Sequence, residues 1–330
     1  MSAGKVVKWG LLGLKMALSV GLFLWLFRHF DVLSAMRQTH LAPNGQAWIW
    51  AAVGVFFLSN LLGSWLWGRL LRLQGVELPF PRVAAYYFIG LFFNNFLPAN
   101  IAGDFARISA ARGHSERTAP VFSATLMDRM MGALAVAVVA MFSILTAWPW
   151  FHDLRVDALV TGLFVVSLLM YLAVFRRDVL GLVEWPFRAL RLRRLAVRMS
   201  QAMDQLHAYR EQGGRLVGLM SLGLLIQVMR VFMHLCVARA LGLHVPIGAI
   251  FTFVPILAAI VMLPISLNGI GVREGASVLL FGIVGLTGAQ AISFQLLTWL
   301  LAVLVSLLGG VIFVFRAPLR WVESWRRAAA

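Results

Sequence analysis

The chain has 330 residues, of which 61% are hydrophobic and only 13% are charged. Soluble domains carry about a quarter charged residues, so this composition excludes a water-soluble globular protein. The net charge of +16 does not indicate nucleic-acid binding, because the basic residues lie at the ends of apolar runs, where Lys and Arg orient membrane proteins. A single cysteine, Cys236, leaves no partner for an intramolecular disulfide or a Cys/His metal cluster. We expect neither a metal nor a cofactor.

Six apolar runs are long enough to cross a bilayer as helices. In chain order they are residues 9–27, 47–68, 119–147, 157–175, 215–238 and 291–315. The first run follows Lys5 and Lys8 and is longer than the apolar core of a signal peptide, so we expect it to be retained as a helix. We therefore predict an all-α, polytopic integral membrane protein in which residues 1–330 form a single membrane domain.

Two further apolar stretches, about 83–106 and 247–287, contain residues that break helices. The expected breaks are at Pro98, Gly103, Pro264, Asn268, Gly269 and Gly271. Irregular backbone at membrane depth survives only where protein or a wet cavity surrounds it. Both stretches are therefore candidate functional elements.

The distribution of arginine predicts how these two stretches lie in the membrane. Residues 176–215 hold nine arginines and four acidic residues, so we expect a basic cytoplasmic loop at 176–214. Counting crossings from this loop places both flanks of 83–106 in the cytoplasm and both flanks of 247–287 outside. We therefore predict two re-entrant broken-helix hairpins that enter from opposite sides, with the N- and C-termini in the cytoplasm.

The two broken stretches share the pattern Leu-Pro-x4-Gly-x3-Arg, which ends at Arg107 in the first and at Arg273 in the second. An acidic residue adjoins each pattern, Asp104 and Glu274, but at different offsets. Each stretch is also flanked by two full spans. These features predict an inverted repeat with units at about 47–147 and 215–315, an arrangement typical of transporters that bind their substrate near the midplane.

Several polar residues fall at membrane depth, where they are costly and usually face a cavity or one another. We predict that they line a substrate path, with arginines holding an anionic head group through their planar, always charged guanidinium groups. The candidates are Asn94, Asn95, Asp104, Arg107, Asp128, Arg129, Arg230, Arg273 and Glu274. The alternative is that Arg–Asp and Arg–Glu pairs only fix the register of the helices.

Three segments resemble the lysylphosphatidylglycerol synthase transmembrane-region family, also called flippase-like domain proteins. They are Phe93-Asn94-Asn95-Phe96-Leu97-Pro98 leading to Gly103-Asp104-Phe105-Ala106-Arg107, Leu126-Met127-Asp128-Arg129-Met130-Met131-Gly132, and Pro264 to Gly275. The resemblance implies a multi-pass domain of the cell inner membrane, which in two-domain members moves aminoacylated phospholipid between leaflets. Those members carry a cytosolic synthase domain after the membrane part, and we expect none in this chain.

The favoured interpretation is a flippase-like transporter that translocates an anionic or phosphate-bearing lipid, with a membrane phospholipid or other amphiphile as its partner. Two alternatives remain open: a non-catalytic membrane subunit that partners a separate lipid-modifying enzyme, and an intramembrane lipid head-group transferase with Asp128 or Glu274 as general base. The sequence contains no nucleotide-binding or nucleophile motif, which favours a transporter over an enzyme.

Overall fold

The computed structural model describes residues 41–96, 102–112, 118–147, 154–174, 176, 203–262, 269 and 271–316. Every regular element in these ranges is a helix, as predicted. The elements are α3 (Gly45–Leu73), α4 (Phe80–Phe96), α5 (Ala102–Arg112), α6 (Thr118–Ala147), α7 (Leu154–Ala173), the 3-10 helix η1 (Ala208–Gln212), α10 (Gly213–Ala240), α11 (Ile247–Met262), α12 (Val272–Gly282) and α13 (Gly288–Arg316).

Four helical stretches in the described part of the chain are long and apolar enough to cross a membrane. They are Gly45–Leu73, Thr118–Leu145, Met203–Ala240 and Gly288–Phe315. They contain the predicted spans at 47–68, 215–238 and 291–315 and cover all but the last two residues of the span predicted at 119–147. The span predicted at 157–175 coincides with α7, whose apolar part, Asp157–Leu172, is shorter than these four. The span predicted at 9–27 lies outside the described residues.

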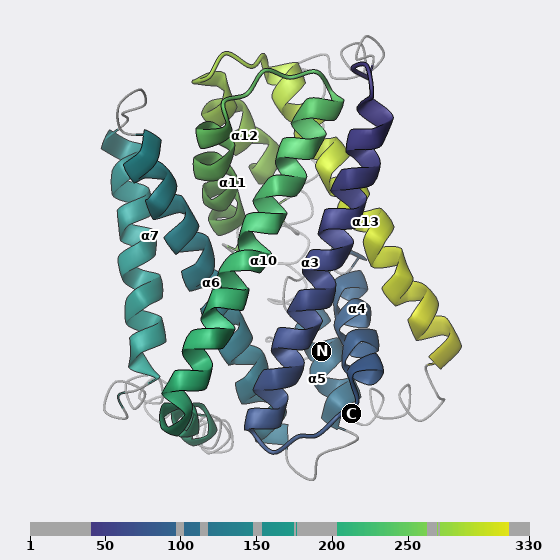
Figure 1. Ribbon diagram of the computed structural model, residues 1–330, viewed down its shortest axis with the longest axis vertical. Coiled ribbons are helices and arrows are strands. Elements are labelled where there is room, and N and C mark those ends of the chain that lie inside the picture. The colour runs from purple at the N-terminus through teal and green to yellow at the C-terminus, as the bar shows by residue number, and fades with distance from the viewer. Residues whose placement is uncertain are drawn as a thin grey trace, which may run out of the picture.

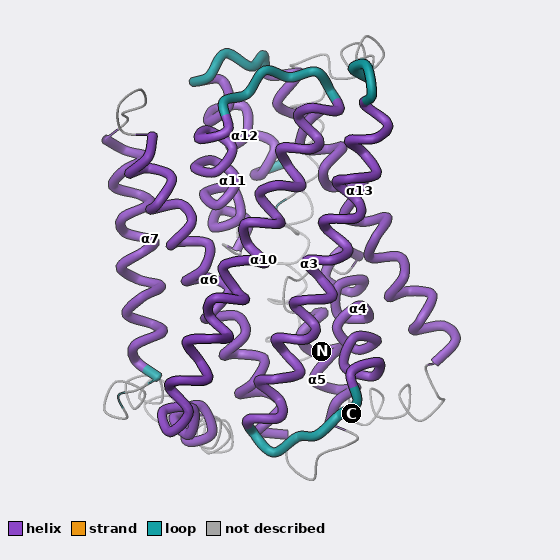
Figure 2. The backbone as a smooth tube through the Cα atoms, in the orientation of Figure 1, coloured by secondary structure: helices purple, strands orange, loops and turns teal. Residues whose placement is uncertain are grey.

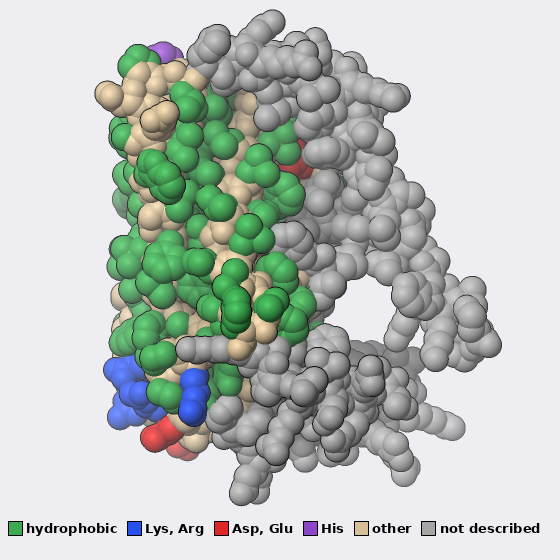
Figure 3. All heavy atoms as spheres, turned by 90° about the vertical axis from the view of Figure 1, so that its right-hand side faces the viewer, with side chains coloured by type: hydrophobic (Ala, Val, Ile, Leu, Met, Phe, Trp, Pro, Cys, Tyr) green, Lys and Arg blue, Asp and Glu red, His purple; other side chains and the backbone are tan. Residues whose placement is uncertain are grey.

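The surface of the long helices is apolar. Large hydrophobic side chains such as Trp50, Phe142 and Val314 are strongly exposed. On the face shown in Figure 3, hydrophobic side chains cover most of the described surface, and Lys, Arg, Asp and Glu gather mainly at its lower end. An apolar surface of this extent on a monomeric chain is stable only against lipid or other protein. Together with the long apolar helices, it identifies a membrane protein.

Helices α3 and α10 form the centre of the molecule and run side by side in opposite directions (Figure 1). Hydrogen bonds join the pair at both ends. Near one end the Ala42 N–H donates to the Ala240 carbonyl oxygen at 3.0 Å. Near the other, the buried Tyr209 hydroxyl donates to the Leu70 carbonyl oxygen at 2.9 Å. Helix α6 packs against both helices, and α7 packs against α6.

Two pairs of shorter helices lie at opposite ends of this centre. Helices α4 and α5, here the first helix pair, contact each other in the lower half of Figure 1, and α11 and α12, the second helix pair, contact each other in the upper half. Figure 2 shows the same placement of the two pairs along the bundle. The predicted breaks at Pro98, Pro264 and Asn268 lie outside the described residues. The break predicted at Gly103 is wrong, because α5 begins at Ala102 and Gly103 lies within its first turn.

Glycine permits two close helix contacts in this region. A Cβ atom on Gly90 of α4 would lie 2.9 Å from the carbonyl oxygen of Gly103 in α5. A Cβ atom on Gly309 of α13 would overlap the backbone at Phe88 of α4, and one on Gly310 would lie 2.7 Å from the ring of Phe92. Small residues let helix backbones approach closely within a membrane, where lipid supplies no hydrophobic drive for association. These glycines therefore fix α4 between α5 and α13.

Candidate functional site

A cavity of about 350 Å³ lies beside the first helix pair, between α3, α4, α5, α6 and α10. Its walls combine glycine and apolar side chains with a concentrated group of polar residues. The polar residues are Asn60, Tyr87, Asn94, Asp104, Arg107, Asp128, Arg129, Gln227 and Arg230. The volume falls within the usual range of small-ligand sites, about 300–1,000 Å³.

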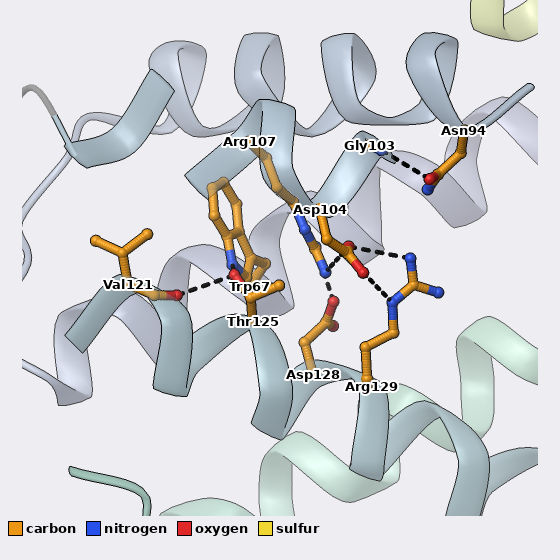
Figure 4. A network of polar contacts seen from close by, with 9 residues as sticks. All are labelled: Trp67, Asn94, Gly103, Asp104, Arg107, Val121, Thr125, Asp128 and Arg129. Carbon is orange, nitrogen blue, oxygen red and sulfur yellow. Dashed lines mark hydrogen bonds and ion pairs between the residues drawn. The ribbon is translucent and has the colours of Figure 1, made fainter. Parts of the chain in front are cut away.

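Four charged residues from α5 and α6 form one connected network in this cavity (Figure 4). The Arg107 guanidinium donates to Asp128 at 2.8 Å and lies 2.9 Å from the Asp104 carboxylate. The Arg129 guanidinium donates to both oxygens of Asp104, at 2.9 and 3.0 Å. Asp104 therefore bridges the two arginines, and α5 is attached to α6 by charge-assisted hydrogen bonds.

Helical spacing explains the network. Asp104 and Arg107 are three residues apart on α5 and share one face of the helix. Asp128 and Arg129 are neighbours on α6 and project about 100° apart, so each meets a different partner on α5. The interpretation that Arg–Asp pairs fix the register of these helices therefore has a structural basis.

The two arginines of the network differ in exposure. The Arg107 side chain is only 5% exposed, whereas 46% of the Arg129 side chain is exposed. The guanidinium of Arg107 also lies over the rings of Trp67, at 5.1 Å, and Tyr87, at 5.5 Å. Cation–π contacts of this kind stabilise a desolvated arginine. Arg107 is therefore a fixed structural charge, and Arg129 is the more accessible one.

A hydrogen-bond chain holds the ring beneath Arg107. Trp67 Nε1–H donates to Thr125 Oγ1 at 3.2 Å, and the Thr125 hydroxyl donates to the Val121 carbonyl oxygen at 2.9 Å. Trp67 is fully buried, and its indole N–H has the hydrogen-bond partner that burial requires. The chain joins α3 to α6 behind the charged network.

The side-chain amide of Asn94, on α4, caps the first turn of α5. Its Oδ1 accepts a hydrogen bond from the Gly103 N–H at 2.9 Å, which is an N-cap contact supplied by another helix. Only glycine fits at position 103, because a Cβ atom there would overlap the Gly90 carbonyl oxygen and the Asn94 amide. The neighbouring Asn95 instead donates to the Leu91 carbonyl oxygen of its own helix at 3.2 Å and does not line the cavity.

Arg230 and Gln227 complete the polar wall from α10, where their spacing of three residues places them on one face. Arg230 forms no ion pair with any carboxylate in the described part of the chain, and its Nε is buried without a hydrogen-bond partner there. It is half-buried as a whole. The Arg107 Nε is likewise buried without such a partner, so Arg230 differs from Arg107 and Arg129 in charge: their charges are compensated by carboxylates.

Arg273 and Glu274 do not line this cavity. They begin α12, where Glu274 accepts a hydrogen bond from the Gly271 N–H at 2.6 Å. The Arg273 Nε donates to Glu274 at 3.1 Å, so the arginine is bound by its own neighbour. Gly269 and Gly271 adopt left-handed φ angles of 75° and 81°, which only glycine adopts readily. The structure thus brings six of the nine predicted residues to one cavity, without Asn95, Arg273 and Glu274.

Four contributors to the site are missing from the predicted residues: Asn60, Gln227, Tyr87 and Trp67. Asn60 is a buried amide in the middle of an apolar run, and its position alone was a signal. Tyr87 and Trp67 carried no such signal, because aromatic residues are common throughout this chain. Among the residues that the structure describes, no group of three or more His, Cys, Asp or Glu side chains is arranged to hold a metal ion.

Comparison with known proteins gives one match. The family model described as the lysylphosphatidylglycerol synthase TM region matches residues 12–310. The match covers α3 through most of α13 and includes every residue of the cavity. Comparisons with the curated proteins and with the solved structures found no match.

Proposed function

Because the chain belongs to the lysylphosphatidylglycerol synthase TM region family, we propose that it translocates an anionic or phosphate-bearing lipid between the leaflets of the cell inner membrane. The supporting observation is the charged cavity between α3, α4, α5, α6 and α10. Charged side chains inside an apolar helical protein are expensive and mark pathways for polar groups. A lipid head group is the polar group that must pass such a protein if the acyl chains stay in the membrane.

The charges in the cavity favour an anion. Three arginines and two aspartates line it, which leaves one positive charge in excess. Arg129 and Arg230 are the arginines that a head group reaches first, because Arg107 is almost completely buried beneath the network. Their planar guanidinium groups bind phosphate oxygens in pairs. Arg107, Asp104 and Asp128 position these groups and close the wall of the cavity.

The proposal includes the inverted repeat and the re-entrant hairpins. The first helix pair and the second helix pair lie at opposite ends of the α3–α10 centre, which is the arrangement that two hairpins entering from opposite sides require (Figure 1). In this reading the units are about 47–147 and 215–315, the first pair opens to the cytoplasm, and both termini are cytoplasmic. The cavity beside α5 then lies along the path between the two faces of the membrane.

Filling the cavity tests the function directly. A Cβ atom on Gly132, which lines the cavity, would meet no atom within 4 Å, so a larger side chain can enter the cavity there. We expect purified wild-type protein to flip an acyl-labelled anionic phospholipid in vesicles, and Gly132→Phe to slow flipping by about tenfold or more. The matched control is Gly162→Phe on α7, at another glycine with open space around it.

Two results would overturn the proposal. One is a rate for the wild type equal to that of protein-free vesicles of the same composition. The other is full activity of Gly132→Phe in a correctly folded sample, as judged by size-exclusion profile and helix content. Turnover of lipid into a covalently altered product would instead favour the transferase. Binding of a separate enzyme without flipping would favour the membrane subunit.

A further inference from the structure

The charged residues that line the cavity leave one positive charge in excess, and Arg230 holds it. Asp104 and Asp128 are each within 2.9 Å of an arginine nitrogen, and together they compensate Arg107 and Arg129. Both carboxylates are largely buried, with 14% and 16% of their side chains exposed. Neither is therefore available to a third cation unless it leaves an arginine. Arg230 holds the remaining positive charge.

The surroundings of Arg230 support binding of a ligand. Its Nε is buried and has no hydrogen-bond partner among the residues that the structure describes. The Asn60 Oδ1 atom, which belongs to another wall of the same cavity, is also buried without a partner in that part of the chain. A partly buried charge without a counter-ion and an unpaired buried acceptor both cost free energy. A ligand with an anionic centre and a hydroxyl donor satisfies both at once.

We propose that Arg230 makes this cavity selective for lipid head groups that carry one negative charge on a phosphodiester and no ammonium group. This inference rests on the proposed function. A phosphodiester offers two unesterified oxygens that match the guanidinium fork and neutralises one positive charge. Gln227, one turn away on α10, and Asn60 then bind uncharged hydroxyl groups of the same head group.

Head groups that contain an amine fit less well. An ammonium group in the cavity needs a carboxylate to compensate it, and both lining carboxylates are bound to arginine. Asn60 Oδ1 accepts a hydrogen bond but carries no charge, so it cannot offset the desolvation of an ammonium ion. The cavity therefore selects in two ways: Arg230 attracts the phosphodiester, and an ammonium group finds no carboxylate to compensate it. Specific binding sites commonly combine attraction of one ligand with a penalty for another.

The experiment compares three acyl-labelled lipids in vesicles that contain the wild-type protein. They are phosphatidylglycerol with one negative charge, phosphatidylethanolamine with no net charge, and an aminoacylated phosphatidylglycerol with a net positive charge. We expect phosphatidylglycerol to be flipped about tenfold faster than the other two. Arg230→Gln should reduce this preference to about twofold or less, whereas Arg230→Lys, which retains charge without the fork, should keep part of it.

The matched control is Arg239→Gln, because Arg239 lies on the same helix but is exposed and does not line the cavity. It should retain the full preference of the wild type. A wild type that flips all three lipids equally, or an Arg230→Gln variant that keeps the preference, would overturn the inference while the proposed function stands.

Failure of the proposed function gives a different result. If the wild type flips none of the lipids, binding of short-chain versions of the same three lipids to the detergent-solubilised protein decides the inference. Preferential binding of phosphatidylglycerol that Arg230→Gln abolishes would support the selectivity alone. Equal binding of all three, or a preference unchanged by Arg230→Gln, would overturn it.

Discussion

The first and second helix pairs contain the same Pro-x4-Gly-x3-Arg pattern, yet their arginines have different partners. In the first pair, Arg107 binds Asp128 on α6 and the Asp104 carboxylate. In the second pair, Arg273 binds the adjacent Glu274, and no ion pair in the described part of the chain joins α12 to another helix. Charge therefore holds the first pair to the bundle, whereas packing holds the second.

The cause lies in the position of the acidic residue. Asp104 precedes its arginine by three residues and lies on the same helical face, where it also reaches Arg129 on α6. Glu274 follows its arginine directly and occupies the third helical position of α12, where its carboxylate caps the helix. A shift of the acid along the sequence thus changes an interhelical network into a local cap.

The largest difference between the pairs should appear in which helices loosen when one ion pair is removed from each. Asp128→Ala leaves Arg107 buried with the shared Asp104 as its remaining carboxylate among the described residues, so we expect the free energy of unfolding to fall by about 3 kcal/mol and amide hydrogen exchange to accelerate in both α5 and α6. Arg273→Ala leaves the Glu274 side chain, which is only 1% exposed, bonded to the Gly271 N–H without its cation, so we expect a similar loss but faster exchange in α12 alone. Reversible unfolding in mixed micelles and amide hydrogen exchange measure both. Faster exchange in a second helix after Arg273→Ala would contradict the distinction between the two pairs.

Replacing glycine by alanine should lower stability at the close contact between α4 and α5 but not at the open end of α12. Gly103→Ala places a methyl group against the Gly90 carbonyl oxygen and the Asn94 amide, and should cost about 2 kcal/mol. Gly282→Ala, at the end of α12, meets no atom within 4 Å and should change stability by about 0.5 kcal/mol or less. The same unfolding measurement applies. A neutral Gly103→Ala would show that α4 and α5 are not in close contact.

The smallest expected effect concerns the start of α5. Asn94→Ala removes the hydrogen bond to the Gly103 N–H and should lower stability by about 1 kcal/mol. Asn95→Ala is the matched control, since among the described residues Asn95 bonds only to the Leu91 carbonyl oxygen within α4, and its effect should be about half as large. Amide hydrogen exchange at the start of α5 should accelerate only in Asn94→Ala. Acceleration in both variants would contradict a specific cap.

The long helices were predictable from the sequence, because an apolar run of membrane-spanning length forms a helix in a bilayer whatever its neighbours are. The apolar runs at 47–68, 119–147, 215–238 and 291–315 specify long helices without reference to their partners. Breaks were predicted at Gly269 and Gly271, and in the structure both have positive φ angles just before α12 begins at Val272. Residues at membrane depth that need a polar neighbour, such as Asp128 and Arg230, were also recognisable from position alone.

The partners of these residues were not predictable, because they depend on how helices rotate against one another. Nothing in the spacing of Asp128 and Arg129 specifies that both reach α5. The rings beneath Arg107 come from α3 and α4, and their choice depends on the same rotation. Arg273 was grouped with Arg107 because the pattern is the same, but the offset of the neighbouring acid already distinguished them.

The contact of α13 with α4 has a mechanical consequence. Helix α13 packs against α12 in the second helix pair and against α4 in the first. At the latter contact, Gly309 and Gly310 bring the two helices together so closely that one cannot slide without the other. Helix α13 therefore connects the two helix pairs at opposite ends of the molecule. We expect a tilt of α13 at the α12 contact to reach α4, and with it the Asn94 amide in the wall of the cavity.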